Sequence, residues 1–192
     1  MTQLILASTS PFRREILQKL HLDFESCAPE IDEQRLEGES PEALVARLAR
    51  AKAEAVTEKY PNALIIGSDQ VAINGEEILG KPGTHEKAIE QLTACSGKKV
   101  TFLTGLALHS STSGETQVKV VPFHVHFREL TTQQIENYLN VEKPYNCAGS
   151  FKSEGFGITL FSKLEGDDPN TLIGLPLIEL IKMLEQEGLS PI

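Results

Sequence analysis

An apolar run that ends in three polar residues constrains this chain more than any other segment. Residues 64–73 are rich in branched apolar side chains and read as a buried strand, yet Ser68, Asp69 and Gln70 interrupt it. A buried carboxylate without a partner is costly. Asp69 must therefore meet cations, a metal ion or a substrate, unless backbone N–H groups of a turn satisfy it.

Length and charge limit the class of protein. With 192 residues the chain can form one domain with a sizeable core, of one or two lobes. Its net charge of −9 opposes a surface that wraps nucleic acid, so we expect no polymer partner, although a few gathered cations can still bind a small phosphorylated ligand. Cys27, Cys95 and Cys147 are irregularly spaced, which is typical of reduced cytoplasmic thiols. No apolar run reaches membrane-spanning length, so we expect a cytoplasmic protein with no membrane partner.

The first strand, predicted over 3–7, runs straight into a helix predicted over 11–20. Ser10 is a good N-cap and Pro11 a good first helical residue. Arg13 and Arg14 follow in the first turn, where cations are unfavourable because the helix dipole is positive there. Two arginines at this place indicate a bound anion, or else they are solvated residues of an ordinary amphipathic helix.

The rest of the chain alternates between helical and extended patterns. Asp167–Thr171 predicts a polar turn. The predicted helices span 41–59, 84–95, 131–141 and 176–187, and the extended segments span 24–28, 99–109, 116–128 and 158–161. Because strands precede helices at some places along the chain and follow them at others, we predict an α/β sheet flanked by helices.

Two clusters of metal-binding residue types have open interpretations. The loop with Glu30 and Glu33 can hold a divalent cation or can be an acidic surface turn. His124 and His126 share one face of a strand and can bind a metal ion. No acidic or cysteine neighbour supports a metal there, so we favour strand histidines that face solvent or a partner subunit.

Three lysines have local settings that bear on function. Lys152 and Glu154 alternate, so an extended chain would point both into one cleft, or the two side chains pair with each other on the surface. Lys52 lies beside the apolar stripe of its helix and is predicted to be solvated. Lys81 lies on a loop that proline restricts.

Five separated motifs occur in one order along the chain: Leu4–Arg14, Pro29–Glu33, Ile66–Val71, Gly80–Pro82 and Ala148–Gly155. Together they resemble the Maf family of nucleotide pyrophosphatases, and more narrowly its branch acting on N7-methyl-GTP. The resemblance covers residues 4–184. It implies an elongated mixed sheet with flanking helices, similar to inosine triphosphatases, in a single domain over 1–192 whose two lobes surround a cleft. It also implies a homodimer.

The resemblance implies that a non-standard nucleoside triphosphate is hydrolysed between its α and β phosphorus atoms, giving a monophosphate and diphosphate with Mg²⁺ or Mn²⁺. Asp69 matches the family's proton acceptor for the attacking water. The positions that set base preference are matched by Phe12, Gln70 and Glu154. The phosphate-facing positions are matched by Ser8, Arg13, Lys52, Lys81 and Lys152, and the metal-facing positions by Glu33, Glu30 and Asp69.

These implied roles agree with the chemistry of the substrate. Hydrolysis of a phosphoanhydride requires neutralised phosphate charge and an oriented water, which cations and a carboxylate supply. N7-methylguanine carries a delocalised positive charge, which the ring of Phe12 and the carboxylate of Glu154 favour. Gln70 is expected to supply an adaptable amide. In this branch Trp is expected at position 12, so stacking on Phe12 is predicted to be weaker.

Two alternative functions remain at the level of the sequence. The first is a dTTP/UTP pyrophosphatase of the same family. Arg, Thr and Gln are expected at the three base-reading positions of that branch, and this chain does not have them there. The second is a regulator of cell division that binds a nucleotide or RNA without turnover. A pure binder has no need of a carboxylate that orients water, which speaks against it.

Overall fold

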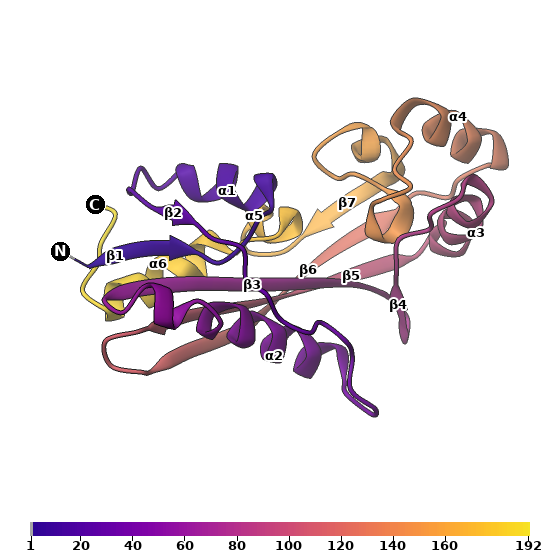
Figure 1. The fold of residues 1–192 in the computed structure, drawn as a ribbon. Coiled ribbons are helices and arrows are strands. Elements are labelled where there is room, and N and C mark those ends of the chain that lie inside the picture. The colour runs from indigo at the N-terminus through magenta and orange to yellow at the C-terminus, as the bar shows by residue number, and fades with distance from the viewer. Residues whose placement is uncertain (1) are drawn as a thin grey trace. The chain divides into compact units, whose positions relative to one another are not determined.

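The computed structural model describes residues 2–192 (Figure 1). The chain divides into two compact units: the first comprises residues up to Gln70, Leu103–Val121 and Asp168–Ile192, and the second comprises Val71–Phe102 and Pro122–Asp167. Three strands contribute residues to both units, namely β3 (Ala63–Asn74), β5 (Lys99–Ser110) and β6 (Thr116–Phe127). The elongated single domain whose two lobes surround a cleft stays a prediction.

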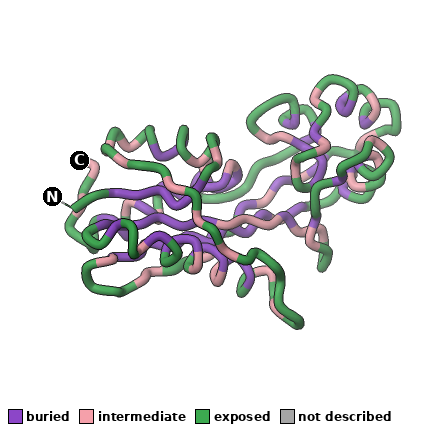
Figure 2. Tube along the Cα trace, in the orientation of Figure 1, coloured by how far each residue is buried: buried purple, intermediate pink, exposed green. Residues whose placement is uncertain are grey.

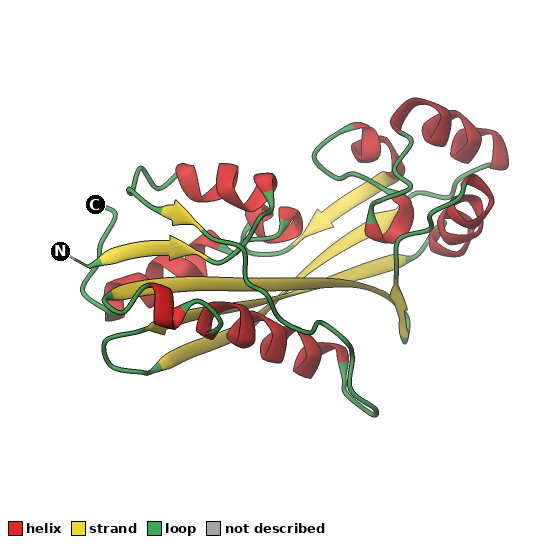
Figure 3. Cartoon of the chain, viewed as in Figure 1, coloured by secondary structure: helices red, strands yellow, loops and turns green. Residues whose placement is uncertain are grey.

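The first unit has the strand order β2-β1-β3-β5-β6. β1 (Gln3–Leu6) pairs in parallel with β2 (Glu25–Ser26) on one side and with β3 on the other. Figure 3 shows these strands in yellow with helices in red. The helices of this unit are α1 (Pro11–Gln18), α2 (Pro41–Glu54), α5 (Pro169–Ile173) and α6 (Leu177–Gln186), with a 3₁₀ turn η1 (Thr57–Lys59) after α2. Strands and helices in this mixture confirm the predicted α/β class.

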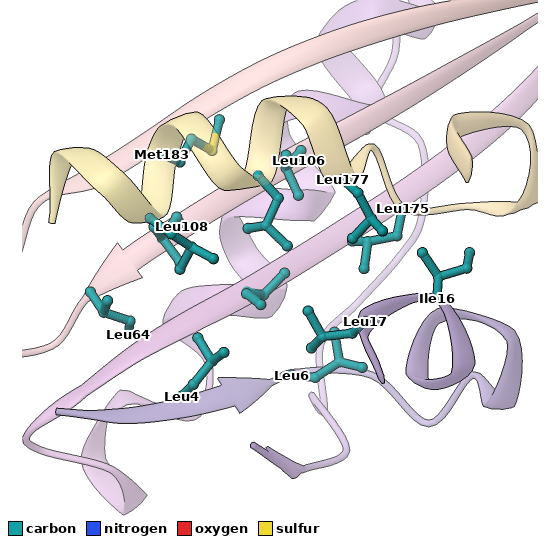
Figure 4. Close-up of a cluster of buried hydrophobic side chains, with 13 residues drawn as sticks. Leu4, Leu6, Ile16, Leu17, Leu64, Leu106, Leu108, Leu175, Leu177 and Met183 are labelled. Carbon is teal, nitrogen blue, oxygen red and sulfur yellow. The ribbon is translucent and has the colours of Figure 1, made fainter. Parts of the chain in front are cut away.

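Alternate residues of the first-unit strands face opposite sides of the sheet, so each strand contributes to two apolar clusters. Leu4, Leu6, Leu64 and Ile66 pack with side chains of α1 and α6 (Figure 4). Ile5, Ala7, Ala63 and Ile65 pack with Ala49 and Ala53 of α2. Buried residues accordingly follow the strands in Figure 2. The first-unit sheet is therefore covered by helices on both faces.

Two glycines let α2 approach the backbone of the sheet. A Cβ atom at Gly67 would lie 2.1 Å from Ala49 O, and one at Gly105 would lie 2.1 Å from Val45 O. Only glycine fits at such a distance, because neither carbonyl belongs to a flexible side chain. Lys52 follows Ala49 by about one helical turn. The close contact at Gly67 therefore also sets where Lys52 leaves α2.

The second unit is built on the remaining parts of the long strands. β4 (Glu77–Leu79) pairs antiparallel with β3 across a turn at Asn74, where Gly75 has a φ of 65°, and β7 (Phe161–Glu165) pairs antiparallel with β6. Its helical segments are α3 (His85–Cys95), α4 (Thr132–Glu142) and the 3₁₀ turns η2 (Ala148–Ser150) and η3 (Phe156–Leu160). Thr84 and Thr131, where two of the helices are predicted to begin, cap α3 and α4.

Several predicted boundaries are wrong, and hydrogen bonds explain two of them. α2 ends at Glu54 because Thr57 Oγ1 donates to Glu54 O at 2.7 Å and the chain turns there. The strand predicted over 158–161 is a 3₁₀ turn as far as Leu160, since Gly157 N donates back to Lys152 O at 3.0 Å and strand pairing begins only at Phe161.

Two further predictions need correction. The extended segment predicted over 24–28 forms a strand only at Glu25–Ser26. The polar turn predicted over 167–171 is the start of a short helix, α5, because the side chain of Asp168 accepts a hydrogen bond from Asn170 N at 2.8 Å and caps it. No helix within residues 2–192 is long and apolar enough to cross a membrane.

Candidate active site

The strand–turn–helix at the start of the chain holds two of the predicted phosphate-facing residues. Ser10 Oγ accepts from Arg13 N at 3.3 Å, which confirms the predicted cap, and the buried Ser8 Oγ accepts from Ser10 N at 3.1 Å. Arg13 Nε donates to Gly174 O at 2.9 Å. Among residues 2–192 the terminal nitrogens of Arg13 have no hydrogen-bond partner, so its remaining donors are available to an anion.

Burial and nearby carboxylates act in opposite directions on Arg13. Burial lowers the pKa of Arg13 from its usual value, whereas the charges of Asp69 and Glu33 raise it. A guanidinium stays protonated in proteins, so the side chain is a fixed positive charge. The interaction with both acids links α1 to Glu33 and to Asp69 on β3.

Lys52 is the centre of the first-unit site. Its Nζ lies 2.8 Å from Asp69 Oδ1 and 2.6 Å from Glu33 Oε1, and its side chain is 11% exposed. The prediction of a solvated lysine is therefore wrong. α2 brings Lys52 to the end of the buried part of β3, where the otherwise unpaired carboxylate of Asp69 is found. The cation that the sequence requires for Asp69 is this lysine.

The pKa of Asp69 is raised above its ordinary value. Burial is the largest cause, the hydrogen bond and charge of Lys52 oppose it, and Arg13 opposes it more weakly. Asp69 thus combines a partly buried carboxylate with a cation in hydrogen-bond contact. This combination suits a group that exchanges a proton with a bound water.

A pocket of about 730 Å³ opens beside these residues, within the first unit. Five predicted site residues line it: Ser8, Arg13, Glu30, Glu33 and Lys52. Hydroxyls, cations and carboxylates therefore face one cavity, at the N-terminus of α1. The loop with Glu30 and Glu33, for which two interpretations were open, forms one wall of this pocket, and both side chains are exposed.

The acids fit a divalent cation that takes part of its ligands from a substrate. Asp69 and Glu33 converge on one ammonium group, and carboxylate oxygens are the ligands that Mg²⁺ and Mn²⁺ prefer. In the part of the chain that the structure describes, no group of three or more His, Cys, Asp or Glu side chains is placed to hold a metal ion. Mg²⁺ commonly uses one or two carboxylates together with phosphate oxygens, which agrees with this pair.

The amide of Gln70 is fixed by its surroundings. Its Nε2 donates to Thr171 O at 2.8 Å and to Thr104 Oγ1 at 2.9 Å, and lies 3.3 Å from Leu172 O. Carbonyl oxygens accept only, so the NH₂ group must face them. Oε1 has no partner among the described residues and is left as an acceptor. The expectation of an adaptable amide is therefore wrong.

Three predicted site residues belong to the second unit. Lys81 is exposed on the loop before α3. Lys152 and Glu154 lie in a turn, so the extended conformation that would point both side chains the same way is absent and that prediction is wrong. Lys152 Nζ lies 3.8 Å from Glu142 Oε1, and Glu154 Oε2 accepts from Ser153 Oγ at 3.3 Å. The two side chains therefore do not pair with each other.

His124 and His126 have ordinary polar partners. His124 Nδ1 lies 2.9 Å from Thr101 Oγ1, and His126 Nε2 lies 3.3 Å from Glu165 Oε1. These contacts occupy one ring nitrogen of each histidine. Together with the lack of a metal-binding cluster in residues 2–192, they favour the structural interpretation of this pair.

Comparison with known proteins covers nearly the whole chain. A family model described as Maf-like protein matches residues 3–187. The chain belongs to the Maf family. The family resemblance inferred from the five motifs is thereby confirmed.

Three curated relatives of this Maf chain are each named 7-methyl-GTP pyrophosphatase. The protein from Colwellia psychrerythraea is 60% identical over 190 residues, covering 99% of this chain and 95% of the relative. The protein from Nitrosococcus oceani is 60% identical over 185 residues, covering 96% and 93%. The protein from Alcanivorax borkumensis is 61% identical over 187 residues, covering 97% and 95%.

A solved structure described as the Ham1 protein of Staphylococcus aureus is 17% identical to this chain, with a TM-score of 0.46, covering 80% of this chain and 88% of the other. A TM-score this low does not establish a shared fold. The fold class follows from the strands and helices of the protein itself.

Some residues of the candidate site carry no signal in the sequence. Thr104 and Thr171 fix the amide of Gln70, yet they are separated from it by 34 and 101 residues. Gly174 accepts from Arg13 through its carbonyl, which any residue type has. The backbone conformation of Gly174, with a φ of 131°, is the feature that favours glycine. The roles assigned to Phe12 and the second-unit residues stay predictions.

Proposed function

We propose that this Maf protein hydrolyses N7-methyl-GTP to N7-methyl-GMP and diphosphate. The observation that carries the proposal is the contact of Lys52 with both Asp69 and Glu33 beside a pocket lined by Ser8 and Arg13. The shared name of the three relatives supports the choice of substrate. In this reaction water attacks the α phosphorus, the bond to the bridging oxygen breaks, and diphosphate leaves.

The first-unit residues divide the work of this reaction. Asp69 accepts the proton of the attacking water, for which its raised pKa makes it a better base than an exposed carboxylate. Arg13 and Lys52 supply fixed positive charge toward the phosphate oxygens. A divalent cation, Mg²⁺ or Mn²⁺, would be held by Asp69 and Glu33, with Glu30 on the same pocket wall, and would neutralise further phosphate charge.

The base-reading roles rest on the family resemblance together with the geometry of Gln70. Its free Oε1 can accept from an N–H group of guanine. Phe12 is 46% exposed and can stack on a ring, and Glu154 is exposed and can attract the charge of the methylated base. Lys81 and Lys152 are proposed to meet phosphate.

The decisive experiment is a substrate panel. The protein is incubated with Mg²⁺ or Mn²⁺ and with 7-methyl-GTP, GTP, dTTP or UTP, and diphosphate is assayed with identification of the nucleotide product. We expect diphosphate and N7-methyl-GMP, with 7-methyl-GTP as the preferred substrate. Preference for dTTP and UTP would favour the pyrimidine branch. Binding without diphosphate from any nucleotide would instead favour a regulator without turnover.

Glu154→Gln is expected to reduce discrimination between 7-methyl-GTP and GTP more than it reduces turnover. The change removes the negative charge that favours the methylated base but keeps the shape of the side chain. The ratio of kcat/KM for the two nucleotides measures it, with Glu129→Gln, an exposed acid of the second unit, as the matched control. An equal loss on both nucleotides would show that Glu154 does not read the methylated base.

Lys52→Gln is expected to move the acidic limb of the kcat profile to higher pH. The base acts when deprotonated, so turnover falls as the pH falls through the raised pKa of Asp69. Because Lys52 lowers this pKa, its loss raises the pKa further. Arg50→Gln removes a positive charge from an exposed site of the same helix and serves as the control. A limb that stays in place would contradict Asp69 as the titrating base.

Two further properties are proposed from the family resemblance: a homodimer and a location in the cytoplasm. Sedimentation velocity measures the first, and fractionation of cells measures the second.

A further inference from the structure

A single side chain of the second unit bridges two turns that each precede a predicted phosphate-facing lysine. Gln91 on α3 donates from Nε2 to Gly80 O at 3.0 Å, and its Oε1 accepts from the hydroxyl of Ser150. Lys81 follows Gly80 directly, and Lys152 follows Ser150 by two residues. Both ends of one amide are therefore used, one for each turn.

The turn at Ser150 has a conformation that needs such support. Gly149 has a φ of 76° and Ser150 a φ of 66°, so two consecutive residues are left-handed, the second of them with a side chain. Ser150 is fully buried, and its hydroxyl has Gln91 as its partner. Gly149 N also donates to Gly80 O at 3.2 Å, which joins the two turns directly.

The segment after Ser150 transmits this arrangement to Lys152. Phe151 packs edge-to-face against Phe127 and Phe161, and Lys152 N donates to the hydroxyl of Tyr138 at 3.1 Å. The backbone on both sides of the strained residue is thus fixed. What sets the turn relative to Gly80 is the side chain of Gln91 together with the Gly149 amide.

We propose that Gln91 is a positioning residue that holds the Gly80–Lys81 turn and the Ser150–Lys152 turn in one fixed arrangement. The inference deepens the proposed function and rests on it, because the arrangement matters for turnover only if Lys81 and Lys152 meet the substrate phosphates. Gln91 itself need not touch substrate. A small displacement of such lysines is costly, since a shift of about 1 Å can reduce kcat/KM roughly 100-fold.

Two variants break the bridge from opposite ends. Gln91→Glu keeps the acceptor for Ser150 but loses the donor to Gly80 O, and Ser150→Ala removes the hydroxyl alone. Gln133→Glu makes the same change on α4, where the amide bonds only the exposed Asn137, and is the control. Thermal unfolding establishes whether each variant is folded. If Gln91→Glu does not fold, Ser150→Ala still tests the bridge.

The first readout is independent of activity. We expect faster hydrogen exchange of the Gly149 amide in Gln91→Glu and Ser150→Ala than in the wild-type protein and in Gln133→Glu. Unchanged exchange in both variants would overturn the bridge. If the wild-type protein releases no diphosphate from any nucleotide, the proposed function fails, and this exchange result alone decides whether Gln91 joins the two turns.

The second readout separates positioning from general stability. We expect kcat/KM for 7-methyl-GTP to fall about 10- to 100-fold in Gln91→Glu, mainly through KM, as phosphate-binding lysines are displaced. In a Lys81→Ala, Lys152→Ala background the same substitution should add little, because the groups that it positions are absent. A full additional loss in that background, or unchanged kcat/KM despite faster exchange, would overturn the positioning role.

Discussion

Asp69→Asn is expected to lower kcat for 7-methyl-GTP hydrolysis by about 10²–10⁴-fold, the range that a general base contributes. Asparagine keeps the shape of the side chain and can still accept a hydrogen bond from Lys52, but it cannot take a proton from water. The fold should be retained. Steady-state kinetics measures kcat, and circular dichroism with thermal unfolding checks the fold.

Asp23→Asn is the matched control for this prediction. Asp23 is an exposed acid of the first unit that does not line the site pocket, so its loss changes net charge without touching the proposed base. We expect wild-type kcat for it. A folded Asp69→Asn protein with near-normal kcat would remove Asp69 as the proton acceptor.

Gly67→Ala is expected to cause a large loss of stability. The new Cβ would lie 2.1 Å from Ala49 O and 2.7 Å from Ala53 N, both backbone atoms of α2. Overpacking usually costs about 1–3 kcal/mol, and more where the neighbours are rigid. Thermal unfolding should show Tm lower by roughly 2–4 °C for each kcal/mol lost.

Gly80→Ala provides the stability control, because a Cβ at that position meets nothing within 4 Å and its backbone does not have a positive φ. Its Tm should stay close to the wild-type value. If Gly67→Ala unfolds at the same temperature as Gly80→Ala, α2 does not depend on the close contact with β3. A folded Gly67→Ala protein should also lose turnover, since Lys52 is carried by the displaced helix.

Local chemistry predicts helix starts and strand faces well. Ser10 and Thr131 cap their helices as the sequence indicates, because an N-cap depends on neighbours within three residues. The alternation of Leu4, Ile5 and Leu6 between two apolar clusters follows from the period of a strand. Such features need no information from distant parts of the chain.

The errors concern side chains whose partners are far away in the sequence. Lys52 looks solvated beside an apolar stripe, and only the approach of α2 to β3 shows that it meets Asp69. The fixed amide of Gln70 depends on Thr171, 101 residues later. The 3₁₀ turn before Phe161 depends on a backbone bond to Lys152. The hydrophobic periodicity of the sequence carries no information on these contacts.

The carbonyl of Gly174 has a consequence for how the site is made during synthesis. It accepts from Arg13 Nε, and Ser68 Oγ lies 3.0 Å from it, so one peptide group late in the chain joins the first helix to the strand that carries the acid. The ribosome must synthesise the whole second unit and most of the first before this link can form. A nascent fragment that stops short of Gly174 has the helix and the acid, but it lacks the acceptor that holds Arg13.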